Sequence, residues 1–182
     1  MDSKLQIISG AYRGRKLALP GGARPTQNRA RIALFNMLTT VLDMPPRAVW
    51  DAFAGSGALG LECLSRYGAA RCVFTDVAPA TVRKNLATLG VDARATVDAA
   101  DAMTRVDAYG AASDLIFVDP PYADAALGAT FVRRVGAVAA PGTVLVWEQD
   151  AAHAVMPGDA WDILRDKTYG RARFLILSRA AV

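Results

Sequence analysis

The residues best suited to chemistry lie in Asp119-Pro120-Pro121-Tyr122, directly after the predicted strand 114–118. Two prolines make a stiff turn that lacks N–H donors, so the carbonyl groups there are available as acceptors. Asp119 adds a carboxylate and Tyr122 adds a flat ring. This combination is typical of a pocket for a planar group with an exocyclic amine. Asp119 and the Pro120 carbonyl would accept the amine hydrogens, and Tyr122 would stack on the ring.

A second candidate is the glycine-rich segment 51–60, between a predicted strand and a predicted helix. Gly55 and Gly57 allow a tight turn that approaches a ligand closely, and the start of the helix offers unpaired N–H groups. With Gly60, the spacing also matches the dinucleotide fingerprint, so an NAD enzyme is an alternative.

Two carboxylates near this loop favour a different ligand. Asp51 ends the strand before the loop, where it would repel a pyrophosphate but could pair with an ammonium group. Asp76 follows the apolar run 73–75, where it could hold ribose hydroxyls. A nucleoside that carries a cationic amino acid fits both positions, and S-adenosylmethionine is such a molecule.

Basic residues are concentrated near the N-terminus. The first 47 residues contain eight Lys or Arg and only two acids, and 17 of the 21 basic residues in the chain are Arg. Arginine suits bidentate phosphate contacts, so this region predicts a nucleic-acid partner. The candidate RNA-binding residues are Arg13, Arg15, Lys16, Arg24, Arg29 and Arg31.

Composition excludes several classes of protein. Hydrophobic residues make up 53% of the chain and charged residues 21%, which argues against disorder. No apolar run reaches the roughly 18 residues of a membrane span. Two cysteines, Cys63 and Cys72, form neither a disulfide framework nor a metal-binding motif. We therefore expect a cytoplasmic protein without a metal ion.

The elements that position these residues alternate between strand and helix. After residue 46, strands are predicted near 48–53, 71–75, 93–97, 114–118 and 143–148, and helices near 58–67, 78–89 and 123–138. This alternation favours a doubly wound, mostly parallel sheet in an α/β fold. Two further apolar runs, 161–164 and 173–177, leave no room for a crossover helix and predict an antiparallel hairpin, which gives seven strands.

The N-terminal region has a different pattern. Short apolar runs at 4–9 and 15–19 predict a β-hairpin, and apolar residues at helical spacing from Asn28 predict a helix that ends at Asp43. We therefore expect a basic, RNA-binding extension over 1–46 and a catalytic domain over 47–182.

Four segments together resemble a known family. The segments 7–17, 24–36, 51–66 and 118–122 are similar to those of the bacterial 16S rRNA guanine-N2 methyltransferases, and the resemblance covers about residues 5–178. It implies a Rossmann-like class I methyltransferase fold. It also implies that an acid near Asp101 accepts a hydrogen bond from the adenine amine of the cofactor. The candidate cofactor-binding residues are Asp51, Phe53, Gly55, Ser56, Gly57, Asp76 and Asp101. Asn28 and Ile32 depart from the family pattern, which usually has Asp and Glu there.

The predicted function is methyl transfer from S-adenosylmethionine to the N2 amine of a guanine in 16S rRNA, with Asp119, Pro120 and Tyr122 as catalytic residues. Guanine presents two adjacent donors that one carboxylate can accept, which favours guanine over adenine. Methylation of adenine N6 or cytosine N4, in RNA or DNA, is the alternative. A non-catalytic RNA-binding protein with the same fold is a further alternative, which the intact Asp119 disfavours. The sequence leaves open which nucleotide is modified, whether the substrate is naked RNA or the assembled small subunit, and the oligomeric state.

Overall fold

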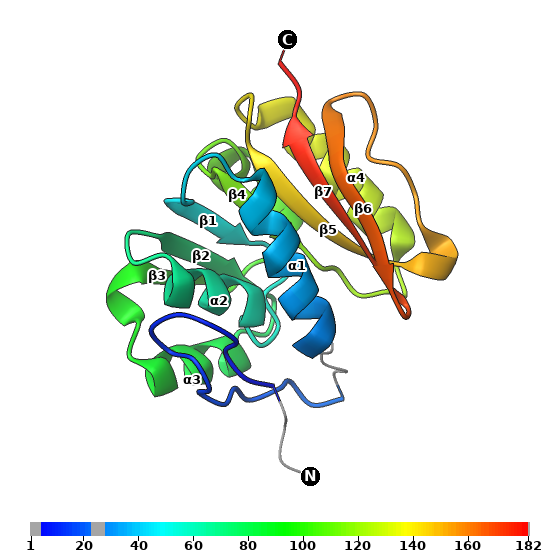
Figure 1. Cartoon of the computed structure of the whole chain (residues 1–182). Coiled ribbons are helices and arrows are strands. Elements are labelled where there is room, and N and C mark those ends of the chain that lie inside the picture. The colour runs from blue at the N-terminus through cyan, green and yellow to red at the C-terminus, as the bar shows by residue number, and fades with distance from the viewer. Residues whose placement is uncertain (1–4, 23–27, 182) are drawn as a thin grey trace.

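The computed structural model describes residues 5–22 and 28–181 and contains a seven-stranded sheet in the order β3-β2-β1-β4-β5-β7-β6 (Figure 1). The strands are β1 (Ala48–Asp51), β2 (Arg71–Thr75), β3 (Ala95–Asp98), β4 (Leu115–Val118), β5 (Val144–Asp150), β6 (Trp161–Tyr169) and β7 (Ala172–Arg179). The first five strands pair in parallel, whereas β7 is antiparallel to both β5 and β6. The predicted α/β class, the seven strands and the antiparallel C-terminal hairpin are confirmed.

Helices cover both faces of the sheet (Figure 1). The α-helices are α1 (Asn28–Val41), α2 (Ala58–Arg66), α3 (Ala80–Leu89) and α4 (Ala125–Val138). Helices α1, α2 and α3 bury their apolar side chains in one cluster, and α4 buries its own in a second cluster on the opposite face. The connection between β3 and β4 contains a 3-10 turn (Ala102–Thr104) and a π turn (Val106–Gly110). Within the described residues, no helix is long and apolar enough to cross a membrane.

The central strands are apolar on both faces because both faces are covered. Leu115 and Phe117 of β4 belong to the cluster of α1, α2 and α3, whereas Ile116 and Val118 belong to the cluster of α4. All four side chains are fully buried. A continuous apolar run that serves both faces is typical of a parallel sheet. The strand therefore places Asp119 at its carboxyl end with little freedom.

The predicted N-terminal hairpin is only rudimentary. In the described part of this segment, one antiparallel bridge joins Gln6 and Lys16, and no regular strand forms. The chain does reverse over residues 10–14, since Gly14 N–H donates to the Ile7 carbonyl at 2.8 Å and Leu17 N–H to the Leu5 carbonyl at 2.9 Å. The segment is therefore a tight reversal that rests on the rest of the protein.

Candidate active site

The carboxyl ends of β1 and β4 mark the centre of the candidate site. The strand order reverses between these two strands, and ligands of doubly wound sheets bind at this switch point. Asp51 ends β1, Asp76 follows β2, and Asp119 follows β4. The three carboxylates predicted from the sequence thus lie at one edge of the sheet.

The glycine loop after β1 is fixed by backbone hydrogen bonds to both neighbouring strands. Ala52 N–H donates to the Phe117 carbonyl at 3.1 Å, and Ala54 N–H donates to the Thr75 carbonyl at 3.0 Å. Gly55 has a φ of +56°, and a side chain there would meet open space. Gly60 is different, because an added Cβ would lie 2.5 Å from Phe74 Cε1. Gly55 therefore leaves the loop open to a ligand, and Gly60 allows α2 to pack closely on β2.

Asp51 is a buried acid that lacks a basic partner among its described contacts. Its side chain is 2% exposed, and its Oδ2 accepts a hydrogen bond from Gly60 N–H at 3.0 Å. Burial raises the pKa of Asp51 to about 7; the Gly60 hydrogen bond opposes this shift and Asp76 adds to it. A cation bound nearby would favour the ionised form. The environment of Asp51 therefore suits a positively charged ligand group.

Asp76 holds the glycine loop from the neighbouring strand. Its Oδ2 accepts from Gly55 N–H at 2.7 Å, and its Oδ1 accepts from Ala78 N–H at 2.8 Å. A carboxylate offers about four acceptor positions, so two more remain for hydroxyl groups. Asp76 is half-buried and can both shape the loop and bind a ligand.

The turn at 119–122 joins the crevice to a pocket beyond it. Burial raises the pKa of Asp119 well above its ordinary value, and the charges of Glu148 and Asp51 raise it further. Tyr122, which is 39% exposed, donates from its hydroxyl to Glu148 Oε1 at 2.7 Å. The pocket is lined by Pro120, Pro121, Tyr122, Asp124, Ala125, Gly128, Trp147, Glu148, Gln149, Asp150 and His153.

The three other side chains predicted to bind the cofactor differ in exposure and in the contacts that they make. Phe53 is half-buried against Phe131, with ring centroids 5.1 Å apart. Ser56 accepts from Ala58 N–H at the start of α2 at 3.2 Å. Asp101 is exposed and accepts from Met103 N–H at 2.9 Å, which caps a 3-10 turn. Their proposed contacts with a cofactor stay predictions.

The basic residues predicted to bind RNA do not form one uniform group. Arg13, Arg15, Lys16 and Arg29 are exposed, and Arg15 also donates to the Thr88 carbonyl at 2.6 Å. Arg24 lies outside the described residues. Arg31 is only 1% exposed, so RNA has no access to its side chain in this structure. We therefore correct the prediction for Arg31 and remove it from the proposed RNA-binding surface.

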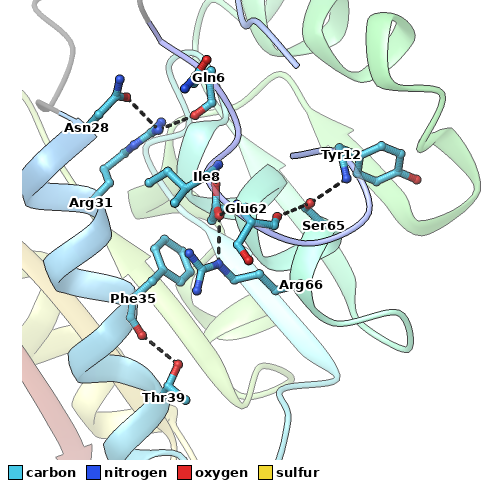
Figure 2. Close-up of polar contacts among 11 residues, drawn as sticks. Gln6, Ile8, Tyr12, Asn28, Arg31, Phe35, Thr39, Glu62, Ser65 and Arg66 are labelled. Carbon is cyan, nitrogen blue, oxygen red and sulfur yellow. Dashed lines mark hydrogen bonds and ion pairs between the residues drawn. The ribbon is translucent and has the colours of Figure 1, made fainter. Parts of the chain in front are cut away.

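Glu62 and Ser65 of α2 anchor the N-terminal reversal (Figure 2). The Glu62 carboxylate, fully buried, accepts from the N–H groups of Ile8 and Ser9, each at 2.9 Å, and from Arg66 Nε at 2.8 Å. Ser65 Oγ accepts from Tyr12 N–H at 3.0 Å. The reversal is therefore attached to the helix that begins at the glycine loop.

Asn85 of α3 makes a second connection. Its Oδ1 accepts from Ala18 N–H at 2.8 Å, and its Nδ2 donates to the carbonyls of Ala18 at 3.0 Å and Ser56 at 2.8 Å. One buried amide thus joins the N-terminal segment directly to the glycine loop.

Arg31 has an incomplete set of partners. Its Nη2 donates to the Gln6 carbonyl and to Asn28 Oδ1, the latter at 3.1 Å (Figure 2). Within the described residues, its Nε and Nη1 are buried without an acceptor. Burial lowers the pKa of Arg31, while Glu62 opposes that shift. A neutral asparagine therefore stands where a carboxylate would offer this arginine a charged partner.

We expect Asn28→Asp to stabilise the protein. A charge-assisted hydrogen bond to Arg31, and a negative charge in the first turn of α1, should together raise the free energy of unfolding by about 1–3 kcal/mol. The partner depresses the folded-state pKa of the new carboxylate, so the gain is present above its unfolded pKa of about 4 and is lost as pH falls through the folded value. Thermal melts at pH 7 and at pH 3 measure both effects. The matched control is Asn36→Asp, an exposed position on the same helix. Equal melting temperatures for the two variants at pH 7 would contradict this prediction.

The sequence does not point to Glu62 or Asn85, and it makes Glu148 only a weak candidate, because that residue ends the predicted strand 143–148. Glu62 and Asn85 lie within predicted helices and were not considered as ligands of distant backbone groups. Their polar side chains at buried helical positions, beside Leu61 and Leu86, are the signal that could have identified them. In the structure Glu148 lies two residues before the end of β5, while Asp51 ends β1 and Asp119 follows β4, and this position near the carboxyl end of a strand is its signal.

Comparisons with known proteins identify relatives of this chain over almost its whole length. Residues 5–178 match the family described as "Conserved hypothetical protein 95". The ribosomal RNA small subunit methyltransferase D of Escherichia coli K12 is 37% identical over 187 residues, which cover 99% of this chain and 92% of that protein. The solved structure of the yhhF protein of Escherichia coli has a TM-score of 0.79 at 35% identity, over 97% of this chain and 98% of that one.

A more distant structure shares the fold. The RNA methyltransferase from Salinibacter ruber, in complex with S-adenosyl-L-homocysteine, has a TM-score of 0.65 at 17% identity, over 87% of this chain and 95% of that one. At this identity the likeness shows the fold alone.

Proposed function

The chain belongs to the family described as "Conserved hypothetical protein 95", and from that membership we propose that it transfers a methyl group from S-adenosylmethionine to the N2 amine of a guanine in 16S rRNA. It is a methyltransferase that acts on ribosomal RNA. The observation that carries the proposal is the Asp119-Pro120-Pro121-Tyr122 turn, which opens on the same edge of the sheet as the glycine loop.

The residues of the crevice fit S-adenosylmethionine. Asp51 offers a buried negative charge for the ammonium group, and Asp76 has acceptor positions left for the ribose hydroxyls. The space beside Gly55 allows a ligand to approach the backbone, and the N-terminus of α2 points at the same place. When bound, this cofactor supplies an electrophilic methyl group. We propose a reaction without a metal ion, because the methyl group of this cofactor is already electrophilic.

We expect Asp76→Ala to weaken S-adenosylmethionine binding by about 1–3 kcal/mol, the scale of a lost charge-assisted hydrogen bond. The loss combines the ribose contact with the support that Asp76 gives to Gly55. Titration calorimetry measures the affinity. Asp101→Ala, at an exposed carboxylate on the same side of the sheet, tests the predicted adenine contact in parallel. Unchanged affinity in Asp76→Ala would contradict the role of Asp76.

In the proposed chemistry, the protein positions the amine and stabilises charge. The lone pair of an exocyclic amine is delocalised into the base, so the nitrogen is a weak nucleophile until it becomes pyramidal. Hydrogen bonds from that amine to Asp119 and to the Pro120 carbonyl favour the pyramidal form and stabilise the positive charge that develops there. Tyr122 would stack on the base and hold the nitrogen in line.

The RNA is proposed to bind along the exposed basic residues of the N-terminal segment: Arg13, Arg15, Lys16 and Arg29. Such residues contact phosphates and contribute affinity that falls with salt. We propose that the substrate is 16S rRNA, free or in the assembled small subunit, and that the protein acts in the cytoplasm.

Nucleoside mass spectrometry tests the proposal directly. Small-subunit rRNA and small subunits from a strain that lacks this protein are incubated with the enzyme and S-adenosylmethionine, then digested. N2-methylguanosine is the expected product. If N6-methyladenosine or N4-methylcytidine is the main product, the target base is adenine or cytosine and the assignment to guanine is wrong. The absence of any methylated nucleoside would contradict the proposed function.

A further inference from the structure

Glu148 contacts Tyr122 of the proposed methylation site, and its charge acts on Asp119. It sits near the end of β5, the neighbour of β4 in the sheet, with its side chain 5% exposed. Its Oε1 accepts from the Tyr122 hydroxyl at 2.7 Å, and its charge is the strongest of those that act on Asp119. One buried carboxylate in β5 therefore accepts a hydrogen bond from the Tyr122 hydroxyl and also raises the pKa of Asp119.

The contact with Tyr122 restricts a side chain that has few other restraints. Tyr122 is 39% exposed and lies in a segment without regular secondary structure. A tyrosine ring in such a position rotates among rotamers unless its hydroxyl is held. Because Glu148 is part of β5, the hydrogen bond ties the ring to the sheet.

We propose that Glu148 is a positioning residue of the methylation site, which fixes the Tyr122 ring at the mouth of the pocket and places a second negative charge near Asp119. This inference rests on the proposed function, which assigns the base to Tyr122 and Asp119. It adds a residue from a different strand, β5, to the site.

The charge of Glu148 has a consequence for pH. Only ionised Asp119 accepts hydrogen bonds with both carboxylate oxygens and stabilises the positive charge that develops on the amine, so the rate should fall as pH falls through the pKa of Asp119. Burial raises this pKa most, and the negative charges of Glu148 in β5 and Asp51 in β1 raise it further. Removing the charge of Glu148 should therefore lower the pKa of Asp119 and move the acidic limb of the rate profile to lower pH.

Two near-isosteric variants separate the two roles. Glu148→Gln keeps an acceptor for the Tyr122 hydroxyl and removes the charge. Tyr122→Phe keeps the ring and the charge but removes the hydrogen bond, and we expect kcat/KM for RNA to fall about fivefold to tenfold. Thermal melts establish that both variants are folded.

Each variant has a matched control. Asp166→Asn removes a carboxylate of β6 that lies outside the pocket, pairs with Arg173 at 2.6 Å and is not among the charges that act on Asp119. Tyr169→Phe changes a tyrosine of nearly equal exposure, 38%, at the far hairpin. Neither control should alter the acidic limb or kcat/KM.

The first measurement needs no activity. Carbon-13 NMR follows the titration of the Asp119 carboxyl group in the ligand-free protein, with Asp119→Asn to assign the signal. A lower Asp119 pKa in Glu148→Gln and an unchanged one in Asp166→Asn support the proposal. An unchanged Asp119 titration in Glu148→Gln overturns it, and so does an equal kcat/KM for Tyr122→Phe and Tyr169→Phe. If the wild-type protein methylates no RNA, the proposed function fails, while the titration still reports on Glu148.

Discussion

We expect Asp119→Asn to lower kcat for RNA methylation by about 10²- to 10³-fold, while cofactor binding and the fold persist. In the proposed mechanism the carboxylate accepts hydrogen bonds from the amine that becomes positively charged, and a preorganised contact to developing charge contributes on this scale. The asparagine amide has a similar size but presents an NH₂ group to a donor and carries no charge. Single-turnover kinetics with saturating S-adenosylmethionine measure the chemical step.

The chain offers a close control for this substitution. Asp124 lies five residues further on, at the same pocket, where it is exposed and accepts from Leu127 N–H at 3.0 Å to cap α4. Asn caps a helix about as well as Asp, so Asp124→Asn makes the same chemical change without disturbing α4. Activity that falls equally in the two variants, or not at all in Asp119→Asn, would contradict the assigned role of Asp119.

Replacing Gly10 by alanine should detach the N-terminal reversal from α2. Gly10 has a φ of +88°, and an added Cβ would lie 2.0 Å from the Ser65 carbonyl oxygen and 2.4 Å from its carbon. These are backbone atoms of a helix and cannot rotate away. The turn must lift, which would break the hydrogen bond from Ala11 N–H to the Ser65 carbonyl at 2.8 Å.

Gly14→Ala separates this clash from backbone strain. Gly14 has a nearly equal φ of +81°, but an added Cβ would meet no atom within 4 Å. Both variants share the strain of a left-handed alanine, roughly 1–2 kcal/mol. Gly10→Ala should lose about 1–3 kcal/mol more, as in other overpacked sites, and should raise the KM for RNA. Urea unfolding compares the two variants, and equal free energies of unfolding would show that the reversal does not rest on α2 as described.

The sheet could be predicted from the sequence because its strands carry strong local patterns. Residues 115–118 are apolar without alternation, which indicates a strand buried on both faces, and the acids at strand ends follow from that assignment. The N-terminal reversal could not be predicted in the same way. The N–H groups of Ile8 and Ala18 bind the side chains of Glu62 and Asn85 in place of a strand ladder. Those partners lie more than fifty residues away, beyond any local pattern.

Arg31 shows how a charge can mislead. Its residue type indicates phosphate binding, but its position three residues before Leu34 and four before Phe35 places it on the buried face of α1. The helical spacing therefore predicts a buried position for Arg31, although its charge suggests an exposed one. The role of Glu148 is different, because its contact with Tyr122 depends on β5 lying beside β4, and only the assembled sheet brings them together.

The packing of α1 has a consequence for how the protein is made. This helix, near the start of the chain, lies against β6 and β7 at the other end, and Arg165 Nη2 donates to Thr40 Oγ1 at 3.4 Å. A ribosome adds about 5–20 residues per second, so α1 leaves the ribosome on the order of ten seconds before its last partners exist. During that interval Leu34, Phe35 and Leu38, which are fully buried in the finished protein, lack part of their cover. The helix that follows the basic reversal therefore takes its final place only after the C-terminal hairpin has been synthesised, and early chaperone contacts with the nascent chain should concentrate on α1.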